Sequence, residues 1–429
     1  MLYIQKNFTK SFFALLSLPA TAMGFALSVQ IAALSWILNS KFGFNLEEIG
    51  LVWIAGPAAG IFGQMIIGFI SDKIWFWGGR RRPFILIGGI MAAIMLLALP
   101  NIGIISEALG FEEVIGVAIA VALSLDLAIN ISFNPTRSVI ADVTPEGDIR
   151  TKGYTWMQTI SGFFGVIAYL IGAFVSNYVL IYFGAALVFL FSIIPTLFIT
   201  EPRELNESDL NDDAEGGETN MPQFLKICLA HAFTWVGVQT MFIYTFAYIK
   251  ENIMGFGTTD VISEIENNDI GFITGISFAI LNTVGFLLPA FVLEPLAKKI
   301  GRVRTHTLCI AIMSLGYVLI IFFAQSMEML FVMMAIVGVG WAAVVSLPFA
   351  IMSESVDQSK MGLYMGLFNL SVVIPQLIAS GLGGFIDGQE NKNMIFIVSG
   401  IALGISALLW LLVKESKNNS PQLTANDVN

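Results

Sequence analysis

Charged residues are scarce in this chain of 429 residues. Asp, Glu, Lys and Arg make up only 12% of it, whereas hydrophobic residues make up 56% and the mean hydropathy is +0.80. A soluble domain carries about a quarter charged residues, so this chain has too little polar side-chain surface to cover a water-soluble fold. The shortage excludes an ordinary soluble protein and favours one that lies in a membrane.

Cysteine and histidine are also rare, with two of each. Both cysteines fall in apolar segments, so no disulfide framework is expected. Two histidines without an HExxH pattern give neither a zinc site nor an obvious nucleophile–base pair. We therefore expect no enzyme activity, no cofactor and no metal site. The formal charge of −10 gives no reason to expect nucleic-acid binding.

Long apolar runs make up most of the sequence. A helix needs roughly 20 apolar residues to cross a bilayer, and lipid forces the backbone polar groups to pair within the segment. The runs cover residues 11–38, 46–72, 83–104, 113–141, 153–178, 179–199, 223–249, 270–294, 304–325, 327–353, 360–386 and 394–414. They predict an all-α membrane protein with twelve transmembrane helices, the first of them retained rather than cleaved as a signal peptide.

The basic residues predict the orientation. If both termini are cytoplasmic, 18 of the 21 Lys and Arg lie on the cytoplasmic side, as positive charge requires. We expect a multi-pass protein of the plasma (inner) membrane with this topology. Residues 201–222 are acidic and poor in apolar side chains, which is typical of a flexible linker. They would separate a six-helix bundle at 1–200 from a second one at 223–414, followed by a polar tail at 415–429.

The two predicted bundles share a loop pattern. Asp72 precedes Gly79-Arg80 by seven residues, and Glu294 precedes Gly301-Arg302 by the same spacing. Parallel repeats of six helices are the architecture of the major facilitator superfamily and imply alternating access. Asp72 with Arg80, and Glu294 with Arg302, are candidate gating latches that break and re-form during rocking. Simple anchoring by positive charge is the alternative.

One polar stripe interrupts the fourth apolar run. Asp126, Asn130 and Arg137 fall on one face of a helix, and an ionisable group at membrane depth is a candidate functional residue. Burial disfavours the charged form of a carboxyl group, so Asp126 is a candidate proton carrier; structural pairing with another helix is the alternative. Asn130 is a candidate sugar ligand, and Arg137 and Asp142 are candidate gating residues.

A second stripe lies on the seventh run, where aromatic and amide side chains share one face. It consists of His231, Trp235, Gln239, Phe242 and Phe246. Such a face suits a sugar, which has apolar CH faces and a rim of hydroxyls; ordinary helix packing is the alternative. Trp235 and Gln239 are the candidate ligands here, joined by Asn369 and Gln376 on the eleventh run. Single polar residues on other runs, among them Gln30, Gln64, Gln158 and Asn282, either line a cavity or join two helices; we include Gln158 among the candidate ligands.

Several segments resemble one family. The stretches "WIAGPAAGIFGQMIIGFISDK" from Trp53, "GRRRPFI" from Gly79 and "LDLAINISFNPTRSVIAD" from Leu125 resemble the sucrose- and maltose-type proton symporters of the major facilitator superfamily. "FTWVGVQTMFIYT" from Phe233 and "KMGLYMGLFNLSVVIPQLIAS" from Lys360 look like the bacterial branch of that family. The resemblance implies proton-driven sugar uptake by a monomer, with the proton-linked acid at Asp126.

The leading hypothesis is therefore a proton-coupled symporter of a disaccharide or glucoside, whose partners are the sugar, the proton and the lipid bilayer. A sodium-coupled or uncoupled carrier of another small polar solute is the alternative within transport. A membrane sensor that keeps a carrier fold is the alternative outside it.

Overall fold

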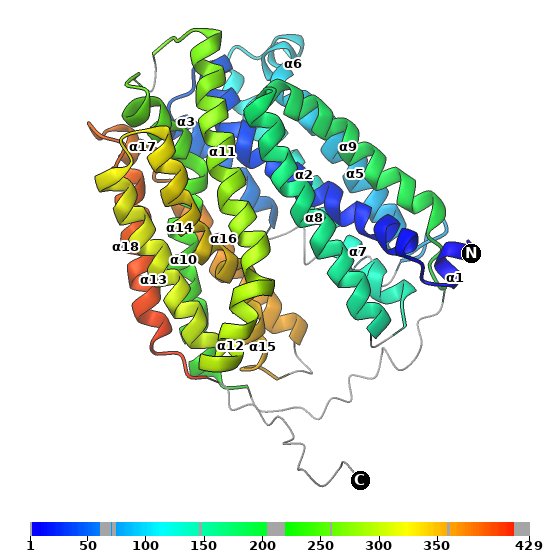
Figure 1. The fold of residues 1–429 in the computed structure, drawn as a ribbon. Coiled ribbons are helices and arrows are strands. Elements are labelled where there is room, and N and C mark those ends of the chain that lie inside the picture. Colours follow the sequence, from blue (N-terminus) through cyan, green and yellow to red (C-terminus); the bar gives the residue numbers. More distant parts are fainter. Residues whose placement is uncertain are drawn as a thin grey trace.

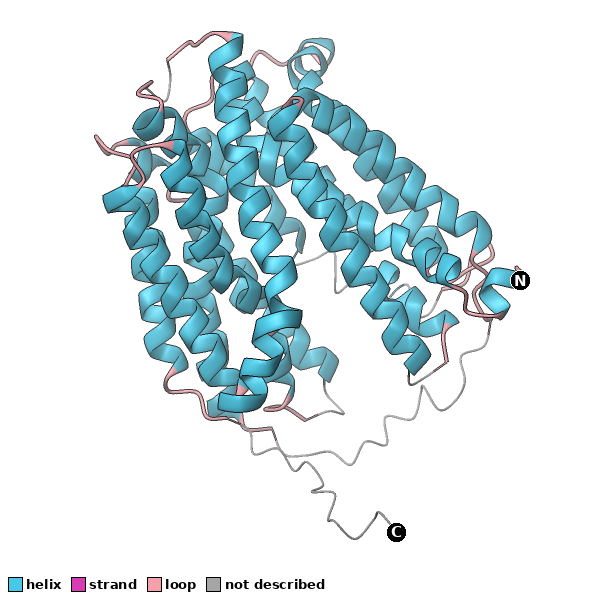
Figure 2. Cartoon of the chain, viewed as in Figure 1, coloured by secondary structure: helices cyan, strands magenta, loops and turns pink. Residues whose placement is uncertain are grey.

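The computed structural model describes residues 2–60, 70, 74–145, 148–203, 219–257, 260–357 and 361–415, and helices form most of this part of the chain (Figure 2). The candidate latch residue Asp72, the candidate Gln64, most of the acidic linker and most of the C-terminal tail lie outside the described residues.

The first group of helices packs together as an N-terminal bundle (Figure 1). A short helix α1 (Tyr3–Lys6) precedes the 33-residue α2. The bundle contains α2 (Lys10–Phe42), α3 (Leu46–Trp53), α5 (Arg82–Ala98), a 3-10 turn η1 (Leu99–Asn101), α6 (Ile102–Ala108), α7 (Val114–Val143), α8 (Asp148–Phe174) and α9 (Asn177–Phe198).

The second group forms a C-terminal bundle beside it (Figure 1). Its helices are α10 (Met221–Tyr248), the π-helical turn η3 (Ile249–Ile253), α11 (Glu264–Leu288), the π-helical turn η4 (Pro289–Leu293), α12 (Glu294–Ile300), α13 (Arg302–Phe323), α14 (Met327–Ser346), α15 (Pro348–Ser353), α16 (Met361–Ser380), α17 (Gly383–Asp387) and α18 (Met394–Trp410).

The predicted apolar runs coincide with these helices. Ten helical segments among the described residues are long and apolar enough to cross a membrane, and Met394–Trp410 is a shorter apolar helix. The run predicted at 46–72 is helical at 46–53 and 55–60, and most of its remainder lies outside the described residues. The prediction of a helical membrane protein is therefore confirmed.

Local sequence signals set where the helices begin. Thr9, Ser176 and Ser326 each accept a hydrogen bond from the backbone three residues on, at the starts of α2, α9 and α14, which satisfies an otherwise unpaired amide. Asn45 with Glu48 forms a capping box at the start of α3.

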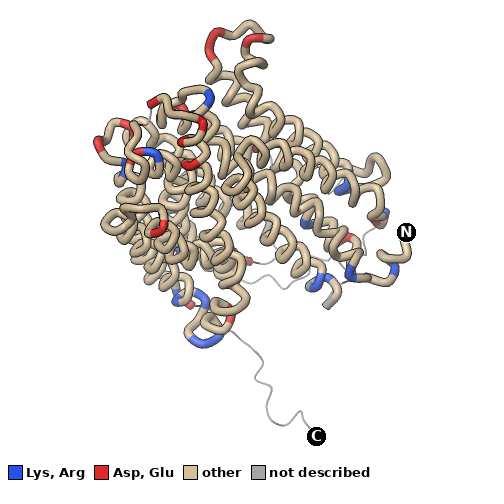
Figure 3. Tube along the Cα trace, turned by 45° about the horizontal axis from the view of Figure 1, so that its top comes forward, with Lys and Arg blue, Asp and Glu red and all other residues tan. Residues whose placement is uncertain are grey.

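Charge distinguishes the two ends of the molecule (Figure 3). We call the end that carries Arg80–Arg82 and Lys298–Arg302 the basic end, and the opposite end, which carries Glu107, Glu112, Glu113, Glu264 and Glu266, the acidic end. The helices of the two bundles lie close together at the acidic end and diverge toward the basic end (Figure 1).

Several contacts between the bundles lie toward the acidic end. The Trp36 indole N–H of α2 donates to the Asn267 carbonyl of α11 at 3.0 Å. The Lys250 ammonium of η3 is buried and donates to the Asn39 side chain of α2 at 3.1 Å. Gly50 of α3 lies so close to α16 that a side chain there would overlap the Ser380 carbonyl oxygen. These contacts hold the two bundles together on this side.

Candidate functional site

Asp126 lies near the middle of α7 and is 8% exposed. The Gln30 amide of α2 donates to its Oδ2 atom at 2.9 Å. Gly56, in the segment after α3, packs against the same side chain. A Cβ added at Gly56 would lie 3.0 Å from Asp126 Oδ2. Asp126 has no ion-pair partner within the described part of the chain. A buried carboxyl group without a counter-ion can take up and release a proton, and the role of Asp126 as a proton carrier stays a prediction.

The polar stripe on α7 runs from the buried centre to the basic end. The Asn130 amide donates to the Asp126 backbone carbonyl at 2.8 Å, and Asn130 is buried while Arg137 is exposed. The Arg137 guanidinium lies over the Phe133 ring at 4.2 Å rather than against Asp126. The stripe therefore joins the central acid to the end where the bundles diverge.

Two of the candidate sugar ligands contact each other directly. The Gln376 amide of α16 donates to the Gln239 Oε1 atom of α10 at 3.2 Å. The sequence predicted each of these residues separately, and the fold brings them together. One turn earlier on α10, the Trp235 indole N–H donates to His231 Nε2 at 2.9 Å.

Aromatic rings continue from Trp235 across the C-terminal bundle. Trp341 of α14 meets Trp235 edge to face at 6.3 Å between centroids, and meets Phe242 at 5.2 Å. The Trp341 N–H donates to Asn282 of α11 at 3.2 Å. Asn282 therefore joins α11 to α14, just as Gln30 joins α2 to α7 through Asp126.

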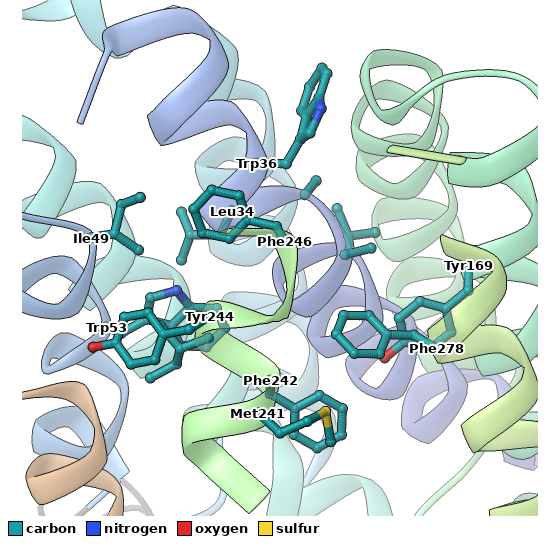
Figure 4. Packing of buried hydrophobic residues seen from close by; sticks show 14 of the residues in the cluster. Leu34, Trp36, Ile49, Trp53, Tyr169, Met241, Phe242, Tyr244, Phe246 and Phe278 are labelled. Atoms are coloured by element: carbon teal, nitrogen blue, oxygen red, sulfur yellow. The ribbon is translucent and has the colours of Figure 1, made fainter. Parts of the chain in front are cut away.

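The aromatic series reaches the N-terminal bundle at Tyr169. Phe242 packs on Phe278 at 5.4 Å, and Phe278 packs on Tyr169 of α8 at 5.8 Å (Figure 4). The Tyr169 hydroxyl lies beside Ser28 and Asn282. Polar and aromatic groups from both bundles therefore meet at mid-depth.

Two predicted ligands lie apart from this cluster. Gln158 is exposed on α8, and Asn369 is half-buried on α16, next to Phe368. In the described residues neither makes a side-chain hydrogen bond to Trp235, Gln239 or Gln376.

At the basic end a carboxylate that the sequence did not indicate organises the N-terminal bundle. Glu201 follows α9 and accepts the backbone N–H groups of Arg80, Arg81 and Arg82 at 2.7, 2.8 and 2.8 Å. The Arg81 Nε atom forms a salt bridge with Asp142 at 3.0 Å, and both side chains are largely buried. Three amides at a helix N-terminus are a strong site for a carboxylate.

The C-terminal bundle repeats this arrangement. Glu415 accepts the backbone N–H groups of Arg302 and Val303 at 2.6 and 3.0 Å, and the Arg302 guanidinium pairs with Glu354. The predicted latch partner Glu294 instead pairs with Lys298 at 2.6 Å, four residues on in the same helix. Glu294 and Arg302 therefore have separate partners in this structure.

Glycines permit the two carboxylates to approach. A Cβ at Gly79 would lie 2.7 Å from Glu201 Oε1, and one at Gly301 would lie 2.5 Å from Glu415 Oε2. Gly301 also has φ +95°, which side chains rarely adopt. The signal that could have identified these acids is their offset: Glu415 follows Glu201 by 214 residues, close to the 213 that separates Pro135 from Pro348.

A surface groove between α10 and α16 has a volume of about 540 Å³ and an almost wholly apolar lining, including Leu229, Phe233 and Ile374. Its lining lacks the amide and acid groups described above, so it does not suit a sugar.

Comparison with known proteins gives a family. Residues 12–388 match the family model described as "MFS/sugar transport protein".

Curated relatives agree with that match. The chain is 23% identical to sucrose transport protein SUT5 of Oryza sativa subsp. indica, over 95% of this chain and 88% of that protein. It is 24% identical to sucrose transport protein SUC4 of Arabidopsis thaliana, over 92% and 89%. A general alpha-glucoside permease of Schizosaccharomyces pombe is 32% identical over 31% of this chain and 25% of the permease.

Solved structures share the fold. A mutant form of the nucleoside transporter NupG superposes with a TM-score of 0.69 at 13% identity, covering 94% of this chain and all of that one. A bacterial homologue of the human lysosomal transporter Spinster, in an inward-facing and occupied conformation, gives a TM-score of 0.62 at 15% identity over 96% and 97%.

Proposed function

The chain belongs to the MFS/sugar transport protein family, whose members are transporters rather than enzymes, and on that premise we propose that it is a proton-coupled symporter of a disaccharide or glucoside. The environment of Asp126 is the main support for proton coupling. It is buried at the middle of a membrane-spanning helix, and its side chain is held by the Gln30 amide instead of a cation. An ionisable group is costly at that depth, so one that is present there is a candidate functional residue.

The proposed architecture has twelve spanning helices in two halves, 1–200 and 223–414, with a linker at 201–222 and a tail at 415–429. The ten candidate spans, the shorter helix Met394–Trp410 and the helical residues 46–60 support that number. The excess of Lys and Arg at the basic end favours a cytoplasmic location for that end and for both termini, in a plasma (inner) membrane.

The arrangement of the bundles fits an inward-facing state. The Trp36–Asn267 and Lys250–Asn39 contacts close the acidic, outer end, and the helices diverge toward the basic, inner end (Figure 1). Alternating access would break these outer contacts and bring the basic ends together.

The sugar would bind between the bundles. Trp235, Gln239 and Gln376 supply an aromatic face and amide groups from the C-terminal bundle, and Asn130 lies one turn from Asp126 on the other. Gln158 and Asn369 remain proposed ligands that would engage after closure. The sucrose and alpha-glucoside relatives support a disaccharide or glucoside as the cargo, and a monomer is sufficient for this mechanism.

The gating residues act at the basic end in this proposal. Asp142 with Arg81, and Arg302 with Glu354, tie neighbouring helices within one bundle, so each bundle rocks as a unit. Asp72, Arg80, Arg137 and Glu294 would supply contacts between the bundles when that end closes.

Proteoliposomes test this function. The purified protein should accumulate sucrose, maltose or another glucoside from a panel when the lumen is alkaline, and should not when a sodium gradient replaces the pH gradient at equal pH. Accumulation driven by sodium alone would overturn the proton coupling. Failure of every sugar in the panel to enter would overturn the proposed cargo.

A further inference from the structure

His231 and Trp235 are joined by one hydrogen bond on the face of α10 that carries Gln239. The Trp235 indole N–H donates to His231 Nε2 at 2.9 Å. His231 is 3% exposed, whereas Trp235 is half-buried. A tryptophan that is partly open and tied by its N–H to a buried acceptor has a fixed ring orientation.

The acceptor itself is held from a second helix. The His231 ring stacks on Phe368 of α16, with 4.8 Å between centroids and 11° between planes. Phe368 and Gln376 lie on α16, and His231 and Gln239 lie on α10, so two contacts join the same pair of helices around Trp235.

The hydrogen bond determines the tautomer of the His231 imidazole. Because Nε2 accepts, this nitrogen carries no proton, and the ring proton of neutral His231 must lie on Nδ1. A residue that replaces His231 can keep the hydrogen bond with Trp235 only if it places an acceptor at the Nε2 position. Glutamine reaches about as far with its amide oxygen, whereas leucine fills the space with no acceptor.

The polar edges of two indoles near the centre of the bundle have partners within the protein. The Trp235 N–H is occupied by His231, and the Trp341 N–H is occupied by Asn282 at 3.2 Å. Both indoles are half-buried and meet edge to face. With their polar edges used within the protein, the rings offer apolar faces of the kind that pack on the CH faces of a sugar.

We propose that His231 is a positioning residue for sugar binding, which holds the Trp235 ring at the angle that the sugar requires. The inference rests on the proposed function, because it assigns His231 a role in recognition of the proposed cargo. Without the acceptor, the Trp235 N–H is left unpaired at a half-buried position, and the ring can rotate to find another partner.

Uptake kinetics should show the effect of removing the acceptor of the Trp235 N–H. His231→Leu should raise the apparent KM for the sugar about three- to tenfold, the range for one neutral hydrogen bond, with Vmax within about twofold of the parent. His231→Gln should restore most of the affinity. His306→Leu is the matched control, because His306 is the other buried histidine and its ring packs on Trp410 at 4.4 Å between centroids rather than on Trp235; it should leave KM unchanged.

A double-mutant cycle separates positioning from packing. Trp235→Phe removes the N–H donor, so adding His231→Leu to it should cause no further rise in KM. Equal, additive effects of His231→Leu in both backgrounds would overturn the inference, as would an equal rise in KM for His306→Leu. Thermal unfolding in detergent verifies that each variant is folded, and sugar binding by tracer displacement replaces uptake for any variant with too little transport.

The two proposals fail in different ways. If the unaltered protein carries none of the sugars, the proposed function is wrong and so is the inference. If it carries one and the cycle is additive, only the role of His231 is wrong.

Discussion

Replacing Gly50 with alanine should shift the protein away from the arrangement described above. A Cβ at Gly50 would overlap the Ser380 carbonyl oxygen and lie 2.8 Å from the Tyr244 hydroxyl oxygen, which itself donates to Ser380 at 2.7 Å. Carbon–oxygen contacts normally measure about 3.3–3.6 Å, so the bundles must separate by roughly 1 Å. Because a backbone oxygen cannot rotate away, we expect a cost of about 1–3 kcal/mol, which corresponds to about a 5- to 150-fold shift toward an outward-open state.

Labelling of a buried cysteine measures that shift. The probe is Ser380→Cys in a background without Cys228 and Cys309, since Ser380 is 1% exposed at the same contact. Gly50→Ala should raise its rate of maleimide labelling at least about fivefold. Gly116→Ala is the control, because nothing lies within 4 Å of its Cβ position. Labelling of the Gly50→Ala protein at the parent rate would refute the reasoning.

Three further changes test other contacts. Glu201→Ala leaves three backbone amides without their carboxylate and should lower the free energy of unfolding by about 2–4 kcal/mol, seen as a lower Tm in detergent; an unchanged Tm would show that the cap contributes nothing. Arg81→Ala should destabilise by about 1–3 kcal/mol because it leaves Asp142 unpaired in a largely buried place, and combining it with Asp142→Ala should cost less than the sum, whereas strict additivity would contradict the pairing. Gln376→Leu removes the partner of Gln239 and should raise the sugar KM about three- to tenfold, and an unaltered KM would place the sugar elsewhere.

Much of the fold could be predicted because its cause is local. The run at 113–141 is apolar apart from one polar stripe, so the bilayer constraint predicts a helix there, and α7 occupies 114–143. Gln239 and Gln376 could be chosen as candidate ligands because each is a polar residue on an apolar helix, and their role in binding stays a prediction. That they bond to each other could not be predicted, because it depends on how α10 packs on α16.

The sequence could not show which ion pairs form at the basic end in this arrangement. Glu294 pairs here with Lys298, one turn along the same helix, and the latch between Glu294 and Arg302 stays a prediction for the state in which that end is closed. Arg302 then pairs with Glu354, and its backbone amide donates to Glu415, 113 residues further along the chain. Only the tertiary fold brings those groups together, although the offset of 214 residues between Glu201 and Glu415 is close to the 213 between Pro135 and Pro348.

Accumulation by an Asp126→Asn variant is the most direct test of proton coupling through this acid. Asparagine keeps the size of the side chain and an acceptor for the Gln30 amide, but it cannot release a proton. In proteoliposomes the variant should still exchange labelled sugar across the membrane at equal pH, and an imposed pH gradient should drive no accumulation, whereas the parent protein should concentrate the sugar. Accumulation by the variant to the level of the parent would contradict the account.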